Sequence, residues 1–544
     1  MTRVLSILAI LVAASAAPAV PRDELLRVAP ADAALFVFVQ NGREHAKQLE
    51  QSPFAKWLPE SALGKQLLPG VDLKQAKAGL EPLFNALGVK PEELLDDVLG
   101  DAIAFAYSPA PDGGTTGERA VFLIRPRKPE TLVKLVAKLN EIQTASGEVK
   151  SVVARQHRGE EYFERQKPNG PSDYYCFRGG VFAFSGTEPD IRAVIERDKD
   201  DAKPVLPAKL AKLGVTDSFA VALINPRHFD KDLAAKVAAA KPAEKAILER
   251  FHEAWLALDS AAIDITLKSD LELGVSIQFQ TGKVPAFAKG WLTGPREKAA
   301  IWSAIPNDAL IAIAGKFKAS EVVGVLRLDA AALQAFGPVF GKDKLPQVLA
   351  ALGPQWAVWA EQPVSSAFLP TVVAAVQVDD KVAEKALDRG IGFVLNSIRV
   401  SYNASHTDQI EIVDSDDGVT SLVNEKGFPA GFQPSYVFKN GWLVVSSSPQ
   451  AVRRFREPKA ASANGEAMLL RISGTAIRAY LQTHREPFAK FLATNGRGEE
   501  KDLIRQFEQA ATVLELLDRI ELAARGDDTG VRLVARLRLA KPLK

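Results

Sequence analysis

This chain of 544 residues has almost no excess of charge of either sign, and it has few long apolar runs. Lysine and arginine number 68 against 66 aspartate and glutamate, and the basic residues are dispersed along the chain. No stripe of positive charge marks a nucleic-acid interface. Beyond the N-terminal segment, no apolar run approaches the roughly 18 residues that a membrane-spanning helix needs. We therefore expect no nucleic-acid partner and no transmembrane span in the mature chain.

Cysteine is nearly absent too, because the chain contains only one. A single cysteine cannot form an internal disulfide, so packing must supply the stability of the fold. Cys176 lies in an apolar stretch at a position where a similar stretch later in the chain has Val437. This match favours a buried, inert thiol. A reactive thiol and an intermolecular disulfide are the alternatives.

The motifs of familiar catalytic and cofactor sites are missing. His252 and Glu253 are not followed by the second histidine of a zinc protease, and neither a GxGxxG after a strand nor a GxSxG is present. Gly337–Lys342 is one residue short of a phosphate-binding loop. Arg125–Lys128 forms a small basic patch, but the matching place in the second half, Asp379–Asp380, is acidic. The sequence predicts no catalytic residue, no metal ligand and no cofactor.

The pattern closest to acid–base chemistry surrounds His157, which shortly precedes Glu160 and Glu161. An imidazole beside two carboxylates can transfer protons or bind zinc. The same residues also suit a solvated turn between predicted strands at 152–156 and 162–165. We favour the turn, since the second half has no histidine in the matching region.

An acidic stretch, Asp414–Asp417, resembles the start of a calcium-binding loop, with Glu425 at the distance of the closing ligand. However, Val419 stands where such a loop needs a glycine. The flanking residues 410–413 and 419–423 alternate as strands do. The pattern therefore predicts a β-hairpin rather than a calcium site.

Aromatic side chains form two groups that could make a platform for a carbohydrate. They are Tyr174, Tyr175, Phe177, Phe182 and Phe184 in the first half, and Trp356, Trp359 and Trp442 in the second. Aromatic residues in strands more often fill a core, and alternate positions supply both faces of a sheet that is covered on each side. We therefore expect these rings in the core.

What the chain does contain is enough apolar sequence for large cores. Its apolar fraction of 47% and charged fraction of 25% are typical of globular proteins, and its length favours two or more domains. At the N-terminus, one positive charge precedes a short apolar run that ends in small residues, Ala14–Ala19. This order predicts a secretory signal peptide over residues 1–19, with an uncleaved anchor as the alternative.

A strand, a turn, a second strand and a helix occur in the same order near the end of each half. Within this segment, Tyr175 matches Tyr436 and Gly180 matches Gly441. Ahead of it Leu99 matches Leu352, and behind it Asp259 matches Asp518. Both glycines fall at the predicted turns. A tandem duplication explains these matches economically.

A smaller unit also recurs, in which an acidic residue, an apolar strand and an amphipathic helix follow one another. Its candidate strands span residues 32–39, 217–224, 308–313 and 466–472. Two nearly identical stretches, Pro53–Leu58 and Pro487–Leu492, follow the first and the last of them. Such a unit buries one strand face and one helix stripe, which suits a layered α+β domain.

Hairpin signals occupy much of the remaining sequence. Residues 102–107 and 120–124 flank a loop rich in proline and glycine, and residues 262–279 and 520–537 close the two halves as hairpins.

The boundary is expected in the stretch 281–303, which has glycine, proline and lysine punctuation. We predict an α+β fold of two tandem homologous halves, residues 20–290 and 291–544. Each half should contain antiparallel sheets packed by helices.

Two further patterns occur once in each half. A Pro-x-Asp-Ala pattern begins at Pro30 and at Pro306, before a predicted strand, and a Tyr-x-Phe-x-x-Gly pattern begins at Tyr175 and at Tyr436, in a predicted hairpin. They add to the signal peptide and the repetition. With these features the chain resembles secreted bacterial proteins of an uncharacterised domain family, a domain of unknown function. The resemblance implies export and a duplicated α+β fold. It carries over no active site.

We expect an exported, non-catalytic binding or scaffolding protein of the cell envelope, located in the periplasm or at the cell surface. Its partner would be another protein or an apolar ligand. The alternative is an envelope-associated hydrolase whose site is assembled from dispersed residues. An enzyme should show a cleft with convergent titratable groups, whereas a binding protein should show an apolar groove or patch.

Overall fold

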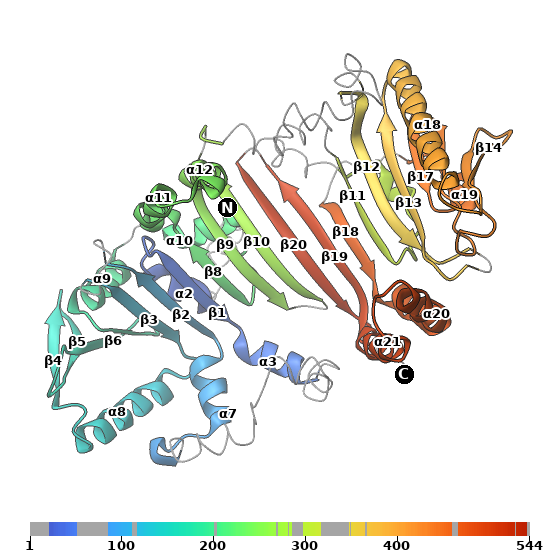
Figure 1. Ribbon diagram of the computed structural model, residues 1–544. Coiled ribbons are helices and arrows are strands. Elements are labelled where there is room, and N and C mark those ends of the chain that lie inside the picture. The colour runs from blue at the N-terminus through green and yellow to red at the C-terminus, as the bar shows by residue number, and fades with distance from the viewer. Residues whose placement is uncertain are drawn as a thin grey trace, which may run out of the picture. The chain divides into compact units, whose positions relative to one another are not determined.

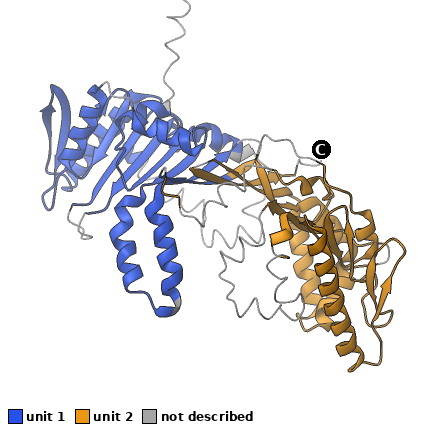
Figure 2. Cartoon of the chain, turned by 90° about the horizontal axis from the view of Figure 1, so that it is seen from above, with its two compact units in different colours: residues 1–268, 273–280 blue, residues 269–272, 281–544 orange. Residues whose placement is uncertain are grey.

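The computed structural model describes most of the chain in two compact units (Figure 2). The described residues are 21–51, 85–110, 117–200, 204–267, 270–280, 282–284, 298–316, 348, 350–364, 367–459, 466–527 and 529–540. Unit 1 comprises residues 1–268 and 273–280, and unit 2 comprises residues 269–272 and 281–544.

Unit 1 is built on an open sheet whose strands lie in the order β10–β9–β8–β1–β2–β3–β7–β6–β5–β4 (Figure 1). The pairings from β9 to β4 are all antiparallel. The strands are β1 Leu35–Gln40, β2 Ala102–Ser108, β3 Arg119–Arg125, β4 Ser151–His157, β5 Glu160–Gln166, β6 Asp173–Arg178, β7 Val181–Ser185, β8 Ala220–Ile224, β9 Leu258–Leu267 and β10 Leu271–Phe279.

Helices cover unit 1 on both sides of this sheet. They are α2 Pro21–Val28, α3 Gly42–Gln51, α7 Pro91–Glu93, the π-helix η1 Leu94–Leu99, α8 Pro129–Ala145, α9 Glu188–Lys199, α10 Val205–Leu213, the 3₁₀ helix η2 Pro226–Phe229, α11 Asp230–Ala238 and α12 Pro242–Ala257. The main core forms where α2, α9 and α10 press on one sheet face. Leu26, Ile191 and Leu210 from these helices pack there with Phe36 and Phe38 of β1.

A second core lies on the opposite face, where η1 and α8 cover β3, β5, β6 and β7. Its buried members include Leu132 of α8, Tyr175 and Phe182. Cys176, the next residue after Tyr175, points into the main core instead. The sheet is therefore sandwiched here, because successive residues of a strand face opposite sides. The prediction that the aromatic residues fill the core is confirmed for Tyr175 and Phe182.

Unit 2 has strands in the order β20–β19–β18–β11–β12–β13–β17–β16–β15–β14, again with antiparallel pairings throughout. They are β11 Ile311–Lys316, β12 Leu352–Glu361, β13 Thr371–Val378, β14 Glu411–Asp414, β15 Thr420–Val423, β16 Ser435–Lys439, β17 Trp442–Ser446, β18 Ala467–Ser473, β19 Leu517–Gly526 and β20 Gly530–Leu539. Subtracting ten from each strand number of unit 2 gives the strand order of unit 1.

The helices of unit 2 are the 3₁₀ helix η4 Ala300–Ser303, α18 Lys381–Asn403, α19 Pro449–Arg454, α20 Gly474–Thr494 and α21 Glu500–Leu514. Ile301 of η4 and Val452 of α19 pack on one sheet face around Trp359 and Trp442. Leu387 of α18 packs on the other face. The expected core positions of these two tryptophans are confirmed.

The predicted hairpins are present in both units. Gly180 lies in the turn between β6 and β7, and Gly441 lies in the turn between β16 and β17. Their φ angles are +81° and +75°, and the preceding Gly179 and Asn440 also have positive φ. Two consecutive residues with positive φ define the tight turn that matches the twist of adjacent strands. A side chain at either glycine would strain that turn.

The structure thus consists of helices on large antiparallel sheets, as the α+β prediction states. Several other predictions fall outside the described residues: the signal peptide over residues 1–19, the stretch Pro53–Leu58, Gly337–Lys342 and most of the boundary 281–303. Among the helices that the structure describes, none is both long and apolar enough to cross a membrane.

Candidate functional site

A shallow pocket with a volume of about 280 Å³ lies between the end of β4 and one side of α9. Its lining comprises His157, Glu188, Pro189, Arg192, Ala193 and Glu196. The charged helix residues are spaced four apart, so they share one face of α9. This spacing gathers two carboxylates and a guanidinium next to an imidazole.

His157 contacts a carboxylate other than those predicted. Its Nε2 atom lies 2.8 Å from Oε1 of Glu196, and this hydrogen bond is the main reason why the pKa of Glu196 is lowered. Glu160 instead pairs with Arg178 and Lys199. Glu161 is exposed and lies on the opposite face of β5 from Glu160. The sequence pattern therefore identified the histidine but not its partner.

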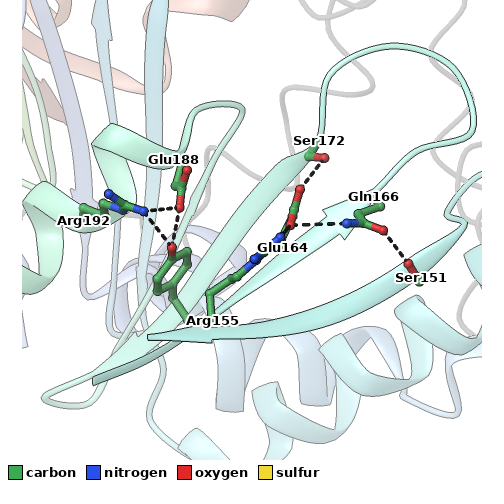
Figure 3. Close-up of polar contacts among 8 residues, drawn as sticks. Ser151, Arg155, Glu164, Gln166, Ser172, Glu188 and Arg192 are labelled. Carbon is green, nitrogen blue, oxygen red and sulfur yellow. Dashed lines mark hydrogen bonds and ion pairs between the residues drawn. The ribbon is translucent and has the colours of Figure 1, made fainter. Parts of the chain in front are cut away.

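At the other end of the pocket, Glu188 is bound by a tyrosine and by an arginine. Tyr162 donates a hydrogen bond to Oε1 of Glu188, and Arg192 donates to the same oxygen at 2.7 Å (Figure 3). The hydrogen bond from Tyr162 is the main reason why the pKa of Glu188 is lowered. Burial is the main reason why the pKa of Tyr162 is raised.

These pKa shifts argue against Glu188 or Glu196 as a general acid. A general acid needs a carboxyl group that holds its proton near neutral pH, but Glu188 and Glu196 both favour the charged form. Burial raises the pKa of Asp101 and of Glu361, yet neither residue lines this pocket. The cluster fixes the β4–β5 hairpin on α9 and leaves its polar groups paired.

The acidic stretch of unit 2 forms the predicted hairpin. Strands β14 and β15 pair antiparallel, and Gly418 has a φ of +77° in the connecting turn. Asp417 accepts a hydrogen bond from Arg453 at 2.7 Å, and Asp414 accepts one from Thr420 at 2.6 Å. In the described part of the chain, no group of three or more histidine, cysteine, aspartate and glutamate side chains is arranged to hold a metal ion.

The basic patch at 125–128 is largely neutralised by acidic partners. Arg125 pairs with Glu24, and Nζ of Lys128 lies 3.0 Å from Oδ2 of Asp97. On the matching acidic side of unit 2, Asp380 caps the N-terminus of α18. These residues therefore have structural roles in their own units.

An open apolar surface lies in unit 1 on the side of the sheet opposite the main core. It spans β2, β1, β8 and β9, and its members are Phe105, Tyr107, Leu35, Val37, Val39, Ala220, Ala222, Ile224, Ala261, Ile263 and Ile265. Every member is half-buried or exposed. Phe105 and Ile263 are 39% and 46% exposed. We call this set the open face of unit 1.

Register explains why the open face is continuous. Val37 lies opposite Phe105 on one side and Ala222 on the other, and Ala222 lies opposite Ile263. Opposed residues share a face of an antiparallel sheet, so these four form one row. Phe36 and Phe38, the neighbours of Val37 in sequence, point into the main core.

Unit 2 exposes apolar residues at the corresponding place. Ile313 of β11 lies opposite Val358 of β12 and Leu470 of β18, and Leu470 lies opposite Leu522 of β19. Ile313 and Val358 are 42% and 41% exposed. The alternation of each strand predicts two faces, but it did not predict which face would stay uncovered.

No protein-family model matches the chain, and no curated protein or solved structure shows significant similarity to it. The surfaces of the molecule are therefore the basis for inferring its function. A fold by itself does not identify a function.

Cys176 should be chemically inert. Its side chain is fully buried, and burial raises the pKa of its thiol to about 12. The reactive species is the thiolate, so native protein at pH 8 is expected to resist a maleimide reagent. Cys176→Val should change the free energy of unfolding by less than about 1.5 kcal/mol, as near-isosteric core replacements do. Mass spectrometry after timed labelling and urea unfolding test both statements. Labelling within seconds would show that the thiol is accessible.

Proposed function

We propose that this protein is an exported, non-catalytic binding or scaffolding protein of the cell envelope, located in the periplasm or at the cell surface. The observation that carries the proposal is the open face of unit 1, an apolar surface of continuous rows across four strands. A contiguous apolar surface on one side of a sheet is a candidate interaction site. Export rests on the charge and apolar pattern of residues 1–19, and sequencing the mature N-terminus tests it.

The shape of the open face favours a protein partner. Strands are spaced by about 4.8 Å and alternate residues by about 7 Å, so the face measures roughly 14 by 14 Å. Small ligands prefer enclosed pockets, whereas an amphipathic helix about 10 Å wide can lie across a flat apolar surface. We therefore assign the open face to an amphipathic helix of a partner protein.

We also infer that the two halves arose by tandem duplication. The strand order of unit 1 becomes that of unit 2 when each strand number is raised by ten. A side-chain contact is repeated as well: Ser185 donates to the carbonyl oxygen of Ala120 at 2.8 Å, and Ser446 donates to that of Val372 at 2.9 Å. Superposition of the two units in an experimental structure tests this inference.

Replacing Phe105 and Ile263 by glutamate should abolish binding at the open face. The probe is a fluorescein-labelled model peptide that forms a helix with leucine on one side and lysine and glutamine on the other. Each buried apolar side chain contributes about 2 kcal/mol, so the loss of both side chains should lower the affinity measured by fluorescence anisotropy by about a thousandfold.

Val205→Glu is the matched control, because Val205 is 62% exposed at the start of α10, away from the open face. This variant should bind the peptide as the wild type does. Equal binding by all three proteins would refute the proposal. Binding of myristate but not of the peptide would assign the open face to acyl chains instead.

The alternative function, an envelope-associated hydrolase, is favoured only by the convergence of His157, Glu188, Arg192 and Glu196 at one pocket. Turnover of an envelope-derived substrate that is lost in His157→Ala, with an unchanged circular dichroism spectrum, would establish it. The binding proposal expects no such turnover.

A further inference from the structure

Strand β4 forms the outer edge of the unit 1 sheet (Figure 1). Its seven residues all pair with β5, from Ser151 opposite Gln166 to His157 opposite Glu160, without a register shift. In the part of the chain that the structure describes, β5 is its only partner strand. One edge of β4 therefore carries backbone groups that another strand can pair with.

The turn determines which backbone groups face outward. Arg158 and Gly159 connect β4 to β5, and both have positive φ, which identifies a two-residue hairpin turn. In such a hairpin the residues that flank the turn bond to each other, and bonded pairs then alternate along the ladder. The N–H and C=O groups of Val152, Ala154 and Gln156 consequently point away from β5.

This edge lacks two of the features with which sheets usually prevent strand addition. It contains no proline and no bulge, and Ala154 and Gln156 are exposed. The corresponding edge strand of unit 2, β14, has only four residues and begins and ends with the acids Glu411 and Asp414. The two units thus differ at equivalent edges.

Side-chain contacts hold β4 in an extended conformation. Arg155 donates to Oε2 of Glu164 from Nε at 3.1 Å and from Nη2 at 2.7 Å, and Ser172 donates to the other oxygen of Glu164 at 3.0 Å (Figure 3). Ser151 donates to Gln166 at 2.9 Å. A strand that is already ordered loses little further entropy when a partner binds.

The charge of the edge determines the chemistry of its partner. Positions 150–158 contain no acidic residue, and Lys150 and Arg158 flank β4 at its two ends. Arg155 is already paired with Glu164. Arg158 has only a loose, exposed contact with Asp200 at 3.5 Å, so the two flanking residues set the charge of this edge. Two copies paired antiparallel about Ala154 would place Lys150 of one opposite Arg158 of the other, which like-charge repulsion disfavours. An extended segment with acidic side chains has the complementary charge.

We propose that β4 accepts, by strand addition, an extended acidic segment of a partner protein. Backbone hydrogen bonds at Val152, Ala154 and Gln156 provide the affinity, and the basic side chains select an acidic sequence. This binding edge is separate from the open face of unit 1, so either proposal can fail without the other.

The test uses the full chain and two fluorescein-labelled peptides, one of alternating glutamate and valine and one of alternating lysine and valine. Fluorescence anisotropy should detect binding of the acidic peptide only. Hydrogen exchange of the outward amides of Val152, Ala154 and Gln156 should slow when this peptide is added. The inward amides of Val153 and Arg155 should exchange slowly throughout.

Ala154→Pro removes one outward N–H without removing a bond to β5, and proline is tolerated at such edge positions. Affinity for the acidic peptide should fall about tenfold, as expected for the lost hydrogen bond and the crowding by the ring. Ala154→Ser keeps the N–H and is the matched control, with unchanged affinity. Lys150→Glu should also weaken binding, and it leaves the backbone intact should the proline variant fail to fold.

Three results would overturn the proposal. One is equal affinity of Ala154→Pro and Ala154→Ser for the acidic peptide. Another is unchanged exchange of the three outward amides at saturating peptide. The last is dimerisation of the full chain in sedimentation, lost in Ala154→Pro, which would assign the edge to a second copy of the chain.

Discussion

Phe38→Ala should lower the free energy of unfolding by about 3–5 kcal/mol, the range for removing a large ring from a packed core. Phe38 is 1% exposed, and its ring lies 6.0 Å from that of Phe36 in the main core of unit 1. Few atoms nearby can move to fill the space, because α2, α9 and α10 all pack on this sheet face. Urea unfolding followed by circular dichroism measures the change.

Val37→Ala is the control for Phe38→Ala, since the two residues are adjacent and face opposite sides of β1. Val37 lies on the open face and is only half-buried, so its truncation should cost less than about 1.5 kcal/mol. A loss of similar size for both variants would show that the open face is covered in the folded protein.

Gly474→Val should destabilise unit 2 by about 3 kcal/mol or more, because the replacement overpacks a backbone contact. Gly474 is the first residue of α20, and a Cβ atom there would overlap the carbonyl oxygen of Leu517 at the start of β19. A backbone carbonyl in a sheet cannot turn aside as a side chain can. The expected result is a lower urea midpoint with an unchanged slope.

Replacing a glycine in the middle of another helix, α18, should stabilise the protein instead. A Cβ atom at Gly392 in α18 would meet no heavy atom within 4 Å. Gly392→Ala should therefore stabilise the protein by about 0.4–1 kcal/mol, chiefly by restricting the unfolded chain. If Gly474→Val and Gly392→Ala changed the free energy of unfolding in the same direction, the close contact between α20 and β19 would be excluded.

Much of the local structure was predictable from the sequence. The hairpins around Gly180 and Gly441, the strands on either side of His157 and the helix that starts at Pro129 all follow from alternation, turn residues and helical spacing. These signals are local, because each depends on residues that are close in the chain.

The arrangement of the strands was not predictable in the same way. β1 pairs with β8, and β11 pairs with β18, although long stretches of chain separate them. Such pairings depend on how whole faces pack, and no short pattern encodes them. The contact between His157 and Glu196 was missed for the same reason, since it joins two elements that meet only in the folded unit.

The open face shows another limit of sequence reasoning. Val37 and Phe38 are both apolar, and alternation assigns them to opposite faces without saying which face is covered. Among the described residues, both faces of β3 and β7 are covered, whereas only one face of β1 and β8 is. A face of a strand is covered where a helix packs on it. The sequence of the strand does not show whether such a helix is present.

The pairing of β1 with β8 also determines when unit 1 can finish folding. Leu35 is made early in synthesis, but its partner Ile224 follows after β2 to β7 have all emerged. Hairpins such as β2–β3 and β6–β7 can close on their own, while β1 must wait for the returning chain. Long-range pairings of this kind slow folding and leave apolar strands exposed in the interval. A chain that crosses a membrane from its N-terminus would therefore need protection of β1, by a chaperone or by rapid delivery of the remaining strands.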